Sequence, residues 1–401
     1  MCQLYRFFDG ASLFTVAKHK QDAGHECHPH EFTLPVSRAV LQTLHTIMKY
    51  AKKSSLSNAL LVALFATAMF SLPVAVVAEP MSITPDVVWV NNTGNAAYTG
   101  NNAFWGVNGI GAVNYAYAIG KYEITNTQYA AFLNAVGQSN ANGVYNANMG
   151  NSSSGTFGGI IQSGTSGAYS YSVASGFEAK PVNWVSWFSA ARYVNWLENG
   201  KPVDATGTAV NNGTYTLGTA TSGNITSWNA GSIWRLPSAS EWMKAAFYNP
   251  DTPGYSTYGT GMNTIVSGTG GSASDGVVYQ VSGSGPQAVG SFSNADNYYG
   301  LFDASGNVRE WTGKVNPAAS GTNLQEAYLA NGSYAGGSDY AVSIDNGVYA
   351  LGTSASAGIG FRVALVPEPS TIALAAMGVA GALGFKRLKR RPKQAADSLP
   401  C

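Results

Sequence analysis

Cysteine and histidine are nearly missing from this 401-residue sequence, and the few that occur lie at its ends. The cysteines are Cys2, Cys27 and Cys401, and all five histidines precede Met48. The 353 residues from Met48 to Pro400 therefore contain neither type. This absence excludes a disulfide framework, a thiolate nucleophile, a thiolate or imidazole metal site and a Ser-His-Asp triad from that stretch. Any metal bound there must take oxygen ligands.

Positive charge is scarce in the central part of the chain. Between Glu79 and Val366 there are nine Lys or Arg and fifteen Asp or Glu, which gives a net charge of −6. Nucleic acid is therefore not expected as a partner, because phosphate binding needs a basic patch that releases counterions. The apolar content of 45% is enough for a globular domain with a sizeable core.

Residues 48–78 have the layout of a signal peptide. Three lysines precede an apolar run, Ala59–Val77, and the small residues Val76 and Ala78 flank the expected cleavage point after Ala78. An uncleaved membrane anchor is the alternative, since the run is long enough to span a bilayer. Residues 1–47 are interpreted as a segment upstream of the true start at Met48 or as a disordered leader, with a genuine cytoplasmic extension as the alternative.

The C-terminal end carries a second export signal. Pro367, Glu368 and Pro369 precede a short apolar stretch, Ile372–Phe385, and a cluster of five Lys and Arg between positions 386 and 391. The positive-inside rule places that cluster in the cytoplasm, and the short span suits a transient membrane association. Residues 366–391 resemble the PEP-CTERM sorting signals of Gram-negative bacteria that make exopolysaccharide, in which an exosortase cuts near the Pro-Glu-Pro. A plain C-terminal anchor is the alternative, and residues 392–401 form a tail.

Two tracts of the region between these signals, 137–176 and 204–232, are crowded with Gly, Ser, Asn and Thr and have no helical apolar period. They are predicted to be long surface insertions between ordered blocks. The tyrosines in the first tract, Tyr145, Tyr169 and Tyr171, are accordingly candidates for surface contact.

Three segments carry helix start signals: Glu123–Val136, Pro181–Gly200 and Trp234–Phe247. Thr125 with Gln128, and Ser238 with Glu241, have the spacing of a capping box, and Ser186 is an expected N-cap. Elsewhere the pattern is short apolar runs broken by Gly and Asn, such as GVVYQV and GIGFRVAL. Few helices, many turns and short strands predict an α+β domain.

The ordered blocks, in this order, resemble the formylglycine-generating enzyme (sulfatase-modifying factor) domain. The matching pieces are EITNTQY, PVNWVSW, WRLPSASEW, AVGSFSN, YYGLFDASGNVREWT, NGSY and the closing GFR, which together span residues 84–365. The resemblance implies a variant of the C-type-lectin fold, rich in irregular structure, with internal calcium. With the export signals, it predicts this α+β domain preceded by an N-terminal signal helix and followed by a C-terminal transmembrane sorting helix.

The segment DASGNVREW offers oxygen ligands around a glycine turn. Asp303 and Glu310 supply carboxylates, and the carbonyls of Gly306 and Val308 lie between them. The resemblance implies that these positions bind structural calcium.

The alternative for this segment is an ion pair of Glu310 with Arg309 or Arg235 and no ion. A second calcium site of the family maps more weakly to Asn263 and Asp275.

The sequence departs from the family at its catalytic centre. The oxidase binds copper through two cysteines after its Gly-Ser-aromatic block, whereas Gly336 and Ala341 stand near those positions here. Relatives that bind iron through histidine are excluded as well. No copper and no formylglycine formation by the known mechanism are therefore expected.

Six tryptophans of the matching blocks are candidates for stacking on sugar rings, but burial in the core is the stronger alternative. They are Trp184, Trp187, Trp196, Trp234, Trp242 and Trp311.

Two functions follow from these patterns. The first is a non-catalytic binding or structural module in the cell envelope, at the surface or in the extracellular matrix, processed by signal peptidase and an exosortase, with exopolysaccharide as a partner. The second is an enzyme with a divergent site, for instance the carboxylates of Asp339 and Asp345.

Overall fold

The computed structural model divides the chain into two compact units, Met1–Glu79 and Pro80–Cys401. It describes residues 2–9, 12–19, 82–100, 110–264, 277–279, 283–292, 297–315, 324–336, 338 and 342–366. In the first unit, strands β1 (Cys2–Asp9) and β2 (Ser12–His19) pair antiparallel along their whole length. All other described elements belong to the second unit.

The described part of the second unit contains three α-helices, and each begins after its predicted N-cap: α3 (Asn126–Val136), α4 (Trp187–Glu198) and α5 (Ala239–Phe247). At α3 the hydroxyl of Thr125 accepts from the Gln128 backbone while the Gln128 side chain accepts from the Thr125 backbone. Ser238 and Glu241 form the same reciprocal pair at α5. Ser186 caps α4 by accepting from the backbone N–H of Ser189. The predicted capping signals are confirmed.

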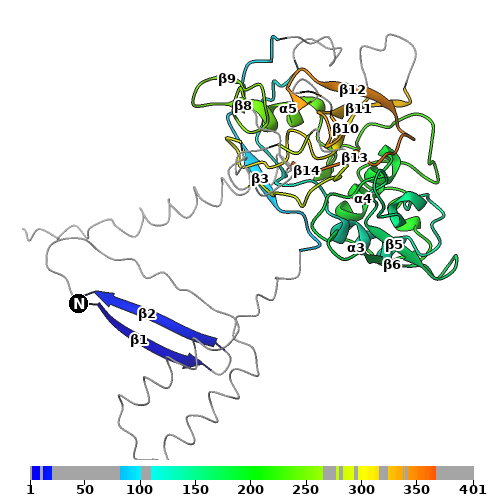
Figure 1. Ribbon diagram of the computed structural model, residues 1–401, viewed down its shortest axis with the longest axis horizontal. Coiled ribbons are helices and arrows are strands. Elements are labelled where there is room, and N and C mark those ends of the chain that lie inside the picture. Colours follow the sequence, from blue (N-terminus) through cyan, green and yellow to red (C-terminus); the bar gives the residue numbers. More distant parts are fainter. Residues whose placement is uncertain are drawn as a thin grey trace, which may run out of the picture. The chain divides into compact units, whose positions relative to one another are not determined.

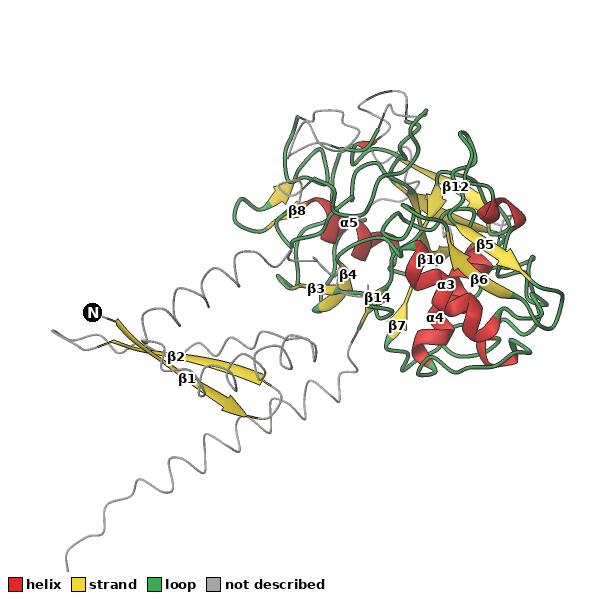
Figure 2. Cartoon of the chain, turned by 60° about the horizontal axis from the view of Figure 1, so that its bottom comes forward, coloured by secondary structure: helices red, strands yellow, loops and turns green. Residues whose placement is uncertain are grey.

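Two four-stranded sheets organise the described part of this unit, in the orders β12-β11-β10-β13 and β3-β4-β14-β7 (Figures 1 and 2). The first contains β10 (Arg309–Val315), β11 (Glu326–Ala330), β12 (Gly347–Leu351) and β13 (Ile359–Gly360). The second contains β3 (Val87–Val90), β4 (Tyr117–Gly120), β7 (Trp234–Arg235) and β14 (Ala364–Leu365). The mixture of short strands and helices confirms the α+β prediction.

Smaller elements complete the described fold. They are η1 (Ala147–Gly150), β5 (Ile160–Ser163), β6 (Ser170–Val173), η2 (Thr208–Val210), β8 (Tyr248–Asn249) and β9 (Gly254–Tyr255). Of the predicted apolar runs, GIGFRVAL contains both β13 and β14, and GVVYQV contributes a parallel bridge between Val278 and Gly306.

The core is aromatic and lies in two main clusters. One surrounds α3 and α4, and the other surrounds α5 and β4. Trp187, Trp242 and Trp311 are completely buried, and Trp196 is 2% exposed. Packing against neighbouring rings and apolar side chains accounts for these four tryptophans, so burial in the core rather than sugar stacking is the correct interpretation of them.

Many residues of the predicted surface insertions at 137–176 and 204–232 are exposed, but both tracts also contribute buried side chains to the core. The first tract contains η1 and the β5–β6 hairpin, and its Tyr145 and Tyr171 are only 9% and 5% exposed. Tyr169 is partly buried against the same core cluster, so these tyrosines are not free for surface contact. The second tract buries Tyr215 completely. Gly- and Asn-rich turns hide isolated apolar residues from any periodicity, yet they let those residues fold back onto α3 and α4.

Several predictions fall outside the described residues. These are the signal helix and its cleavage point at Ala78, and the sorting motif Pro367, Glu368 and Pro369 with its apolar stretch. Within the ranges that are described, no helix combines the length and the apolar character needed to cross a membrane.

Candidate functional site

A buried ion pair joins the end of the domain to its central sheet. Arg362, between β13 and β14, donates from Nε and Nη2 to the two carboxylate oxygens of Glu310 on β10, each at 2.6 Å. Trp242 of α5 adds a third bond, from Nε1 to Glu310 Oε2 at 2.7 Å. Arg362 is 0% and Glu310 1% exposed. Because each side chain comes from a different element, this contact forms only in the folded domain.

Two further carboxylates lie beside this pair. Glu123, just ahead of α3, accepts from the backbone N–H of Val308 at 3.0 Å and from Nδ2 of Asn307 at 2.7 Å. Asp303 accepts from the backbone N–H of Gly290 at 2.7 Å. Asp303 and Asn307 both have a left-handed backbone, with φ of 57° and 53°, which Asp and Asn tolerate better than most residues. We call Glu123, Asp303, Glu310 and Arg362 the charge cluster.

The charge cluster holds three carboxylates and one guanidinium. Burial raises the pKa of Glu123 well above its ordinary value, and the negative charges of Asp303 and Glu310 raise it further. Burial likewise raises the pKa of Asp303, to about 6. Burial alone would lower the pKa of Arg362, but the charge of Glu310 outweighs that effect and raises it. A buried excess of negative charge favours either a retained proton or a bound cation.

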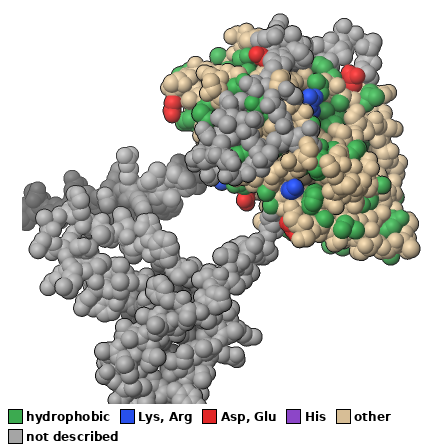
Figure 3. Space-filling model, viewed as in Figure 1, with side chains coloured by type: hydrophobic (Ala, Val, Ile, Leu, Met, Phe, Trp, Pro, Cys, Tyr) green, Lys and Arg blue, Asp and Glu red, His purple; other side chains and the backbone are tan. Residues whose placement is uncertain are grey.

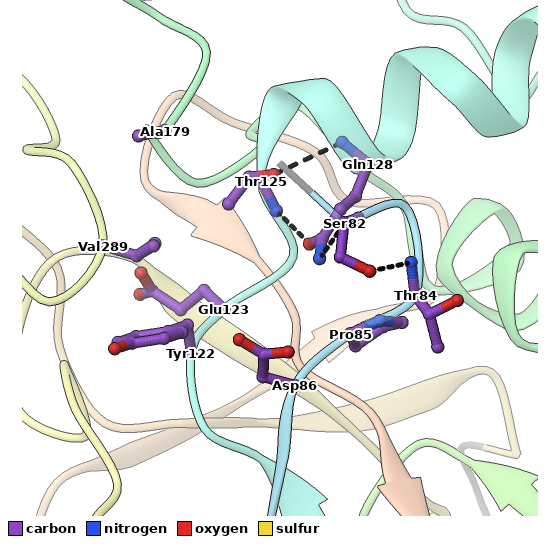
Figure 4. A pocket seen from close by; sticks show the side chains of 10 residues that line it. All are labelled: Ser82, Thr84, Pro85, Asp86, Tyr122, Glu123, Thr125, Gln128, Ala179 and Val289. Carbon is purple, nitrogen blue, oxygen red and sulfur yellow. Dashed lines mark hydrogen bonds between the residues drawn. The ribbon is translucent and has the colours of Figure 1, made fainter. Parts of the chain in front are cut away.

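A cavity of about 240 Å³ opens next to the charge cluster (Figure 4). Its walls come from the segment ahead of β3, the residues leading into α3 and two loop positions: Ser82, Thr84, Pro85, Asp86, Tyr122, Glu123, Thr125, Gln128, Ala179 and Val289. The Gln128 side chain donates to the Ser82 carbonyl and so ties the first segment to α3. Glu123 therefore links this cavity to the interior, and Asp86 adds a second carboxylate to its wall.

A second cavity, of about 340 Å³, lies at the start of α5. Uncharged residues line it: Gly94, Asn95, Ala112, Val113, Asn114, Tyr115, Ser238 and Ser240. The Tyr115 hydroxyl donates to Glu241 Oε1 at 2.9 Å and accepts from Arg235 Nη2 at 3.0 Å. Arg235 and Glu241 form a second buried ion pair, and the Arg235 guanidinium lies over the ring of Trp228 at 4.6 Å.

The residues predicted to bind calcium lie close to one another in the chain, but Glu310 is already occupied by hydrogen bonds. Both oxygens of Glu310 are hydrogen-bonded to Arg362 and Trp242, so Glu310 fits a metal ligand poorly. Gly306 and Val308 lie in the turn between Asp303 and β10. Within the described ranges, no three Asp, Glu, His or Cys side chains are arranged to hold an ion.

At the weaker predicted site, the Asn263 side chain accepts from the backbone and hydroxyl of Thr257, while Asp275 is outside the described residues.

Gly336, which stands near a position of the family's copper cysteines, lines neither cavity. Gly336 closes a turn by donating to the Ser333 carbonyl, and Ala341 lies outside the described residues, as does Asp339. Asp345 accepts from the Tyr98 hydroxyl at 2.8 Å.

The sequence analysis did not identify Arg362 as the partner of Glu310. It also did not identify Glu123 as a buried carboxyl of the charge cluster. Glu310 pairs with Arg362, not with Arg309 or Arg235, because β10 and β13 lie parallel and bring the closing GFR onto it. Arg362 and Glu123 both stand in sequence blocks that resemble the family, GFR and EITNTQY. Only the tertiary contacts show that they meet.

Comparisons with known proteins bear on most of the chain. A model of the sulfatase-modifying factor enzyme 1-like domain matches residues 76–366, and a model of the PEP-CTERM protein-sorting motif matches residues 365–391. No curated protein gives a significant match.

Solved structures with some similarity include CarF, at 20% identity over 72% of this chain and 100% of that one, with a TM-score of 0.45. Treponema denticola variable protein 1 has 20% identity over 70% and 95%, with a TM-score of 0.43. PvdO from Pseudomonas aeruginosa has 16% identity over 71% and 96%, also with a TM-score of 0.43.

Proposed function

Because this chain belongs to the sulfatase-modifying factor enzyme 1-like family and carries a PEP-CTERM protein-sorting motif, we propose that it is an exported surface or matrix-associated protein whose domain is a non-catalytic binding or structural module. The motif indicates export to the cell envelope of a Gram-negative bacterium and processing by an exosortase. The domain would then work outside the cytoplasm.

One observation carries the non-catalytic part of this proposal. The matched domain, residues 76–366, contains no cysteine and no histidine. The copper centre implied by the family resemblance needs thiolates, and no oxygen-donor side chain replaces their soft-ligand character. The charge cluster supports the same proposal, because its ion pair is fully bonded between β10, α5 and the end of the domain.

An oxidase assay tests this function directly. The purified protein is loaded with copper and incubated with oxygen and a cysteine-containing sulfatase peptide, and formylglycine is followed by mass spectrometry. We expect no product above a no-enzyme blank. A relative that retains both copper cysteines serves as the positive control, and turnover by the present chain would refute the proposal.

Structural calcium is part of the same proposal, although Glu310 is unsuited as its ligand. The excess of buried carboxylates supports a cation near Asp303 and the carbonyls of Gly306 and Val308, within a C-type-lectin variant of the fold. We expect calcium to raise the midpoint of thermal unfolding and EDTA to reverse the shift. Asp303→Asn should remove most of that response, whereas Asn263→Ala should change it less. Equal responses in wild type and Asp303→Asn would argue against this site.

The partners proposed for processing and binding follow from the export signals. Signal peptidase would cut after Ala78 and the exosortase near Pro367, and exopolysaccharide is a proposed partner outside the cell. Nucleic acid is not proposed. The face of the domain in Figure 3 supports this, because Lys and Arg appear there as isolated spots among uncharged and hydrophobic side chains.

A divergent enzyme is the second candidate. It is favoured by Glu123, a carboxyl with a raised pKa that lines a cavity with Asp86. If such chemistry exists, Glu123→Gln should abolish turnover of glycan substrates while the protein stays folded by circular dichroism. Unchanged turnover in that variant, or none in wild type, would leave the module as the function.

A further inference from the structure

The chain leaves the folded domain from the middle of a sheet. Strand β14 (Ala364–Leu365) lies between β4 and β7, and it is the last strand before the sorting motif. The backbone N–H of Val366, one residue later, donates to the Ile233 carbonyl at 2.8 Å. The domain is therefore held in the sheet up to the residue directly before Pro367, with no spacer between the fold and the motif.

One row of side chains crosses this sheet beside that exit. Register pairs Trp89 with Ala118, Ala118 with Leu365, and Leu365 with Trp234. Residues paired in this way point to the same face, and strands lie about 4.8 Å apart, so the two tryptophans are about 14 Å from each other across the row. We call Trp89, Leu365 and Trp234 the exit face.

The exit face is partly open to solvent. Trp89 is 51% exposed, and Leu365 and Trp234 are partly exposed, whereas the small Ala118 between them is buried at 0%. The alternate row of the sheet is buried, with Ile119 and Ala364 both at 0% exposure. The row itself contains no Lys, Arg, Asp or Glu. At the end of the row the Glu198 carboxylate accepts from the backbone N–H groups of Ile233 and Trp234. Two indoles in a row without a charged side chain suit the interface of a membrane, where the ring contacts acyl chains and the N–H remains hydrated.

The length of the tether limits how far this face can be from a bilayer. Five residues separate Val366 from the apolar stretch that begins at Ile372. Fully extended, those steps span about 20 Å, and the headgroup layer takes up about 5 to 8 Å of that distance. A domain of this size is about 50 Å across. The side from which β14 leaves must therefore be turned to the membrane while the tail is uncut.

We propose that, before the exosortase cuts the tail, the exit face lies against the phospholipid bilayer with Trp89 in the headgroup region. This inference rests on the proposed sorting of the chain through a membrane-held tail. Because the contact depends on a short tether, cutting the tail would release the face to solvent.

Photocrosslinking of the full chain tests the contact. Benzoylphenylalanine is placed at Trp89 in one variant and, as a matched control, at Ile161 in another; the two side chains are 51% and 43% exposed. Ile161 is on β5, on the other side of the domain from β3 (Figures 1 and 2). In phosphatidylcholine vesicles we expect about five-fold more lipid adduct at position 89 than at position 161. A third variant with the label at Leu365 serves if the Trp89 variant does not fold.

A longer link between the domain and the apolar stretch provides a second test of the contact. A 20-residue Gly/Ser insertion after Val366 adds about 25 Å of mean reach, so lipid adduct at position 89 should fall several-fold. Equal adduct at positions 89 and 161, or adduct only to co-reconstituted exosortase, would overturn the proposal. Flotation of the vesicles distinguishes a failure of the membrane-held tail from a failure of the contact. A chain that does not float refutes the membrane-held tail and this contact with it, whereas a floating chain without lipid adduct at positions 89 and 365 refutes the contact alone.

Discussion

Arg362–Glu310 and Arg235–Glu241 are both buried arginine–glutamate pairs, but their surroundings differ. Arg235 and Glu241 are six residues apart, and Glu241 also serves the capping box of α5. Tyr115 lies beside that pair and bridges both partners. Arg362 and Glu310 are 52 residues apart and share their site with Glu123 and Asp303. One pair is balanced in charge, and the other stands in an excess of negative charge.

This difference shows how the same chemistry serves two purposes. The Arg235 pair stabilises a local unit, the strand, turn and helix from β7 to α5. The Arg362 pair holds distant parts of the chain together and leaves two carboxyls whose protonation depends on pH. Replacing each arginine separately should therefore have unequal costs, and the following predictions test that inequality.

The largest effect is expected for Arg362→Met. It leaves the buried carboxyls of Glu123 and Glu310 and the half-buried Asp303 without a cation, so we expect the free energy of unfolding at pH 7 to fall by about 4 kcal/mol. Urea unfolding followed by tryptophan fluorescence measures it. A loss below about 1 kcal/mol would mean that a proton or a bound cation, rather than Arg362, compensates the cluster.

Arg235→Met should cost less, about 2 to 3 kcal/mol, because Glu241 keeps donors in the Ser238 backbone and the Tyr115 hydroxyl. The same urea titration applies. If this variant were as damaged as Arg362→Met, the balance of charge would not be what separates the two pairs.

Asp303→Asn should change how stability depends on pH. The pKa of Asp303 is raised to about 6 in the folded protein, so the folded state keeps a proton that the unfolded chain releases above about pH 4. Stability contributed by that proton is lost as the pH rises from about 4 through 6. Because Asp303 is partly exposed, solvent reduces this effect. Between about pH 4 and 6, we expect the free energy of unfolding to change by about 1 to 2 kcal/mol less in the variant than in wild type. Parallel curves for wild type and variant would contradict the assigned pKa.

Ser238→Ala tests the local side of the comparison. It removes the acceptor for the Glu241 backbone N–H at the start of α5, and we expect a loss of about 1 kcal/mol. Thr125→Ala, at the matching box of α3, should cost about the same. Thermal unfolding of both variants checks this, and a loss above about 3 kcal/mol would show that Ser238 also supports the Arg235 pair.

The smallest effect is expected for a buried polar group without a partner. Among the described residues, the Tyr193 hydroxyl is buried with no hydrogen-bond partner. Tyr193→Phe should therefore be neutral or stabilising by up to about 1 kcal/mol. Tyr129→Phe is the control, since its hydroxyl donates to the Val144 carbonyl at 2.7 Å and its loss should destabilise by about 1 kcal/mol. A clear destabilisation by Tyr193→Phe would indicate an unseen partner, such as water.

Local signals in the sequence predicted the helices well. Capping depends on residues three positions apart, so Thr125, Ser186 and Ser238 could be identified without knowledge of the fold. Tyr145 and Tyr171 were misjudged, because their burial depends on a hairpin folding back onto α3 rather than on any periodicity. In the candidate site, too, one part could be predicted from the sequence and another part could not. DASGNVREW was recognised as important, but Glu123 meets it from 185 residues away.

The sequence alone determined the family, the sorting motif, the helix starts and the absence of thiolate and imidazole chemistry from residues 48–400, because these depend on residue type and short spacing. Only the tertiary structure decided which carboxylates share Arg362 and that the chain leaves the domain from a strand that β4 separates from the strand of Trp89. The physical reason is that burial and charge pairing depend on contacts between distant segments. Parallel pairing of β10 with β13 and the position of β14 between β4 and β7 create those contacts.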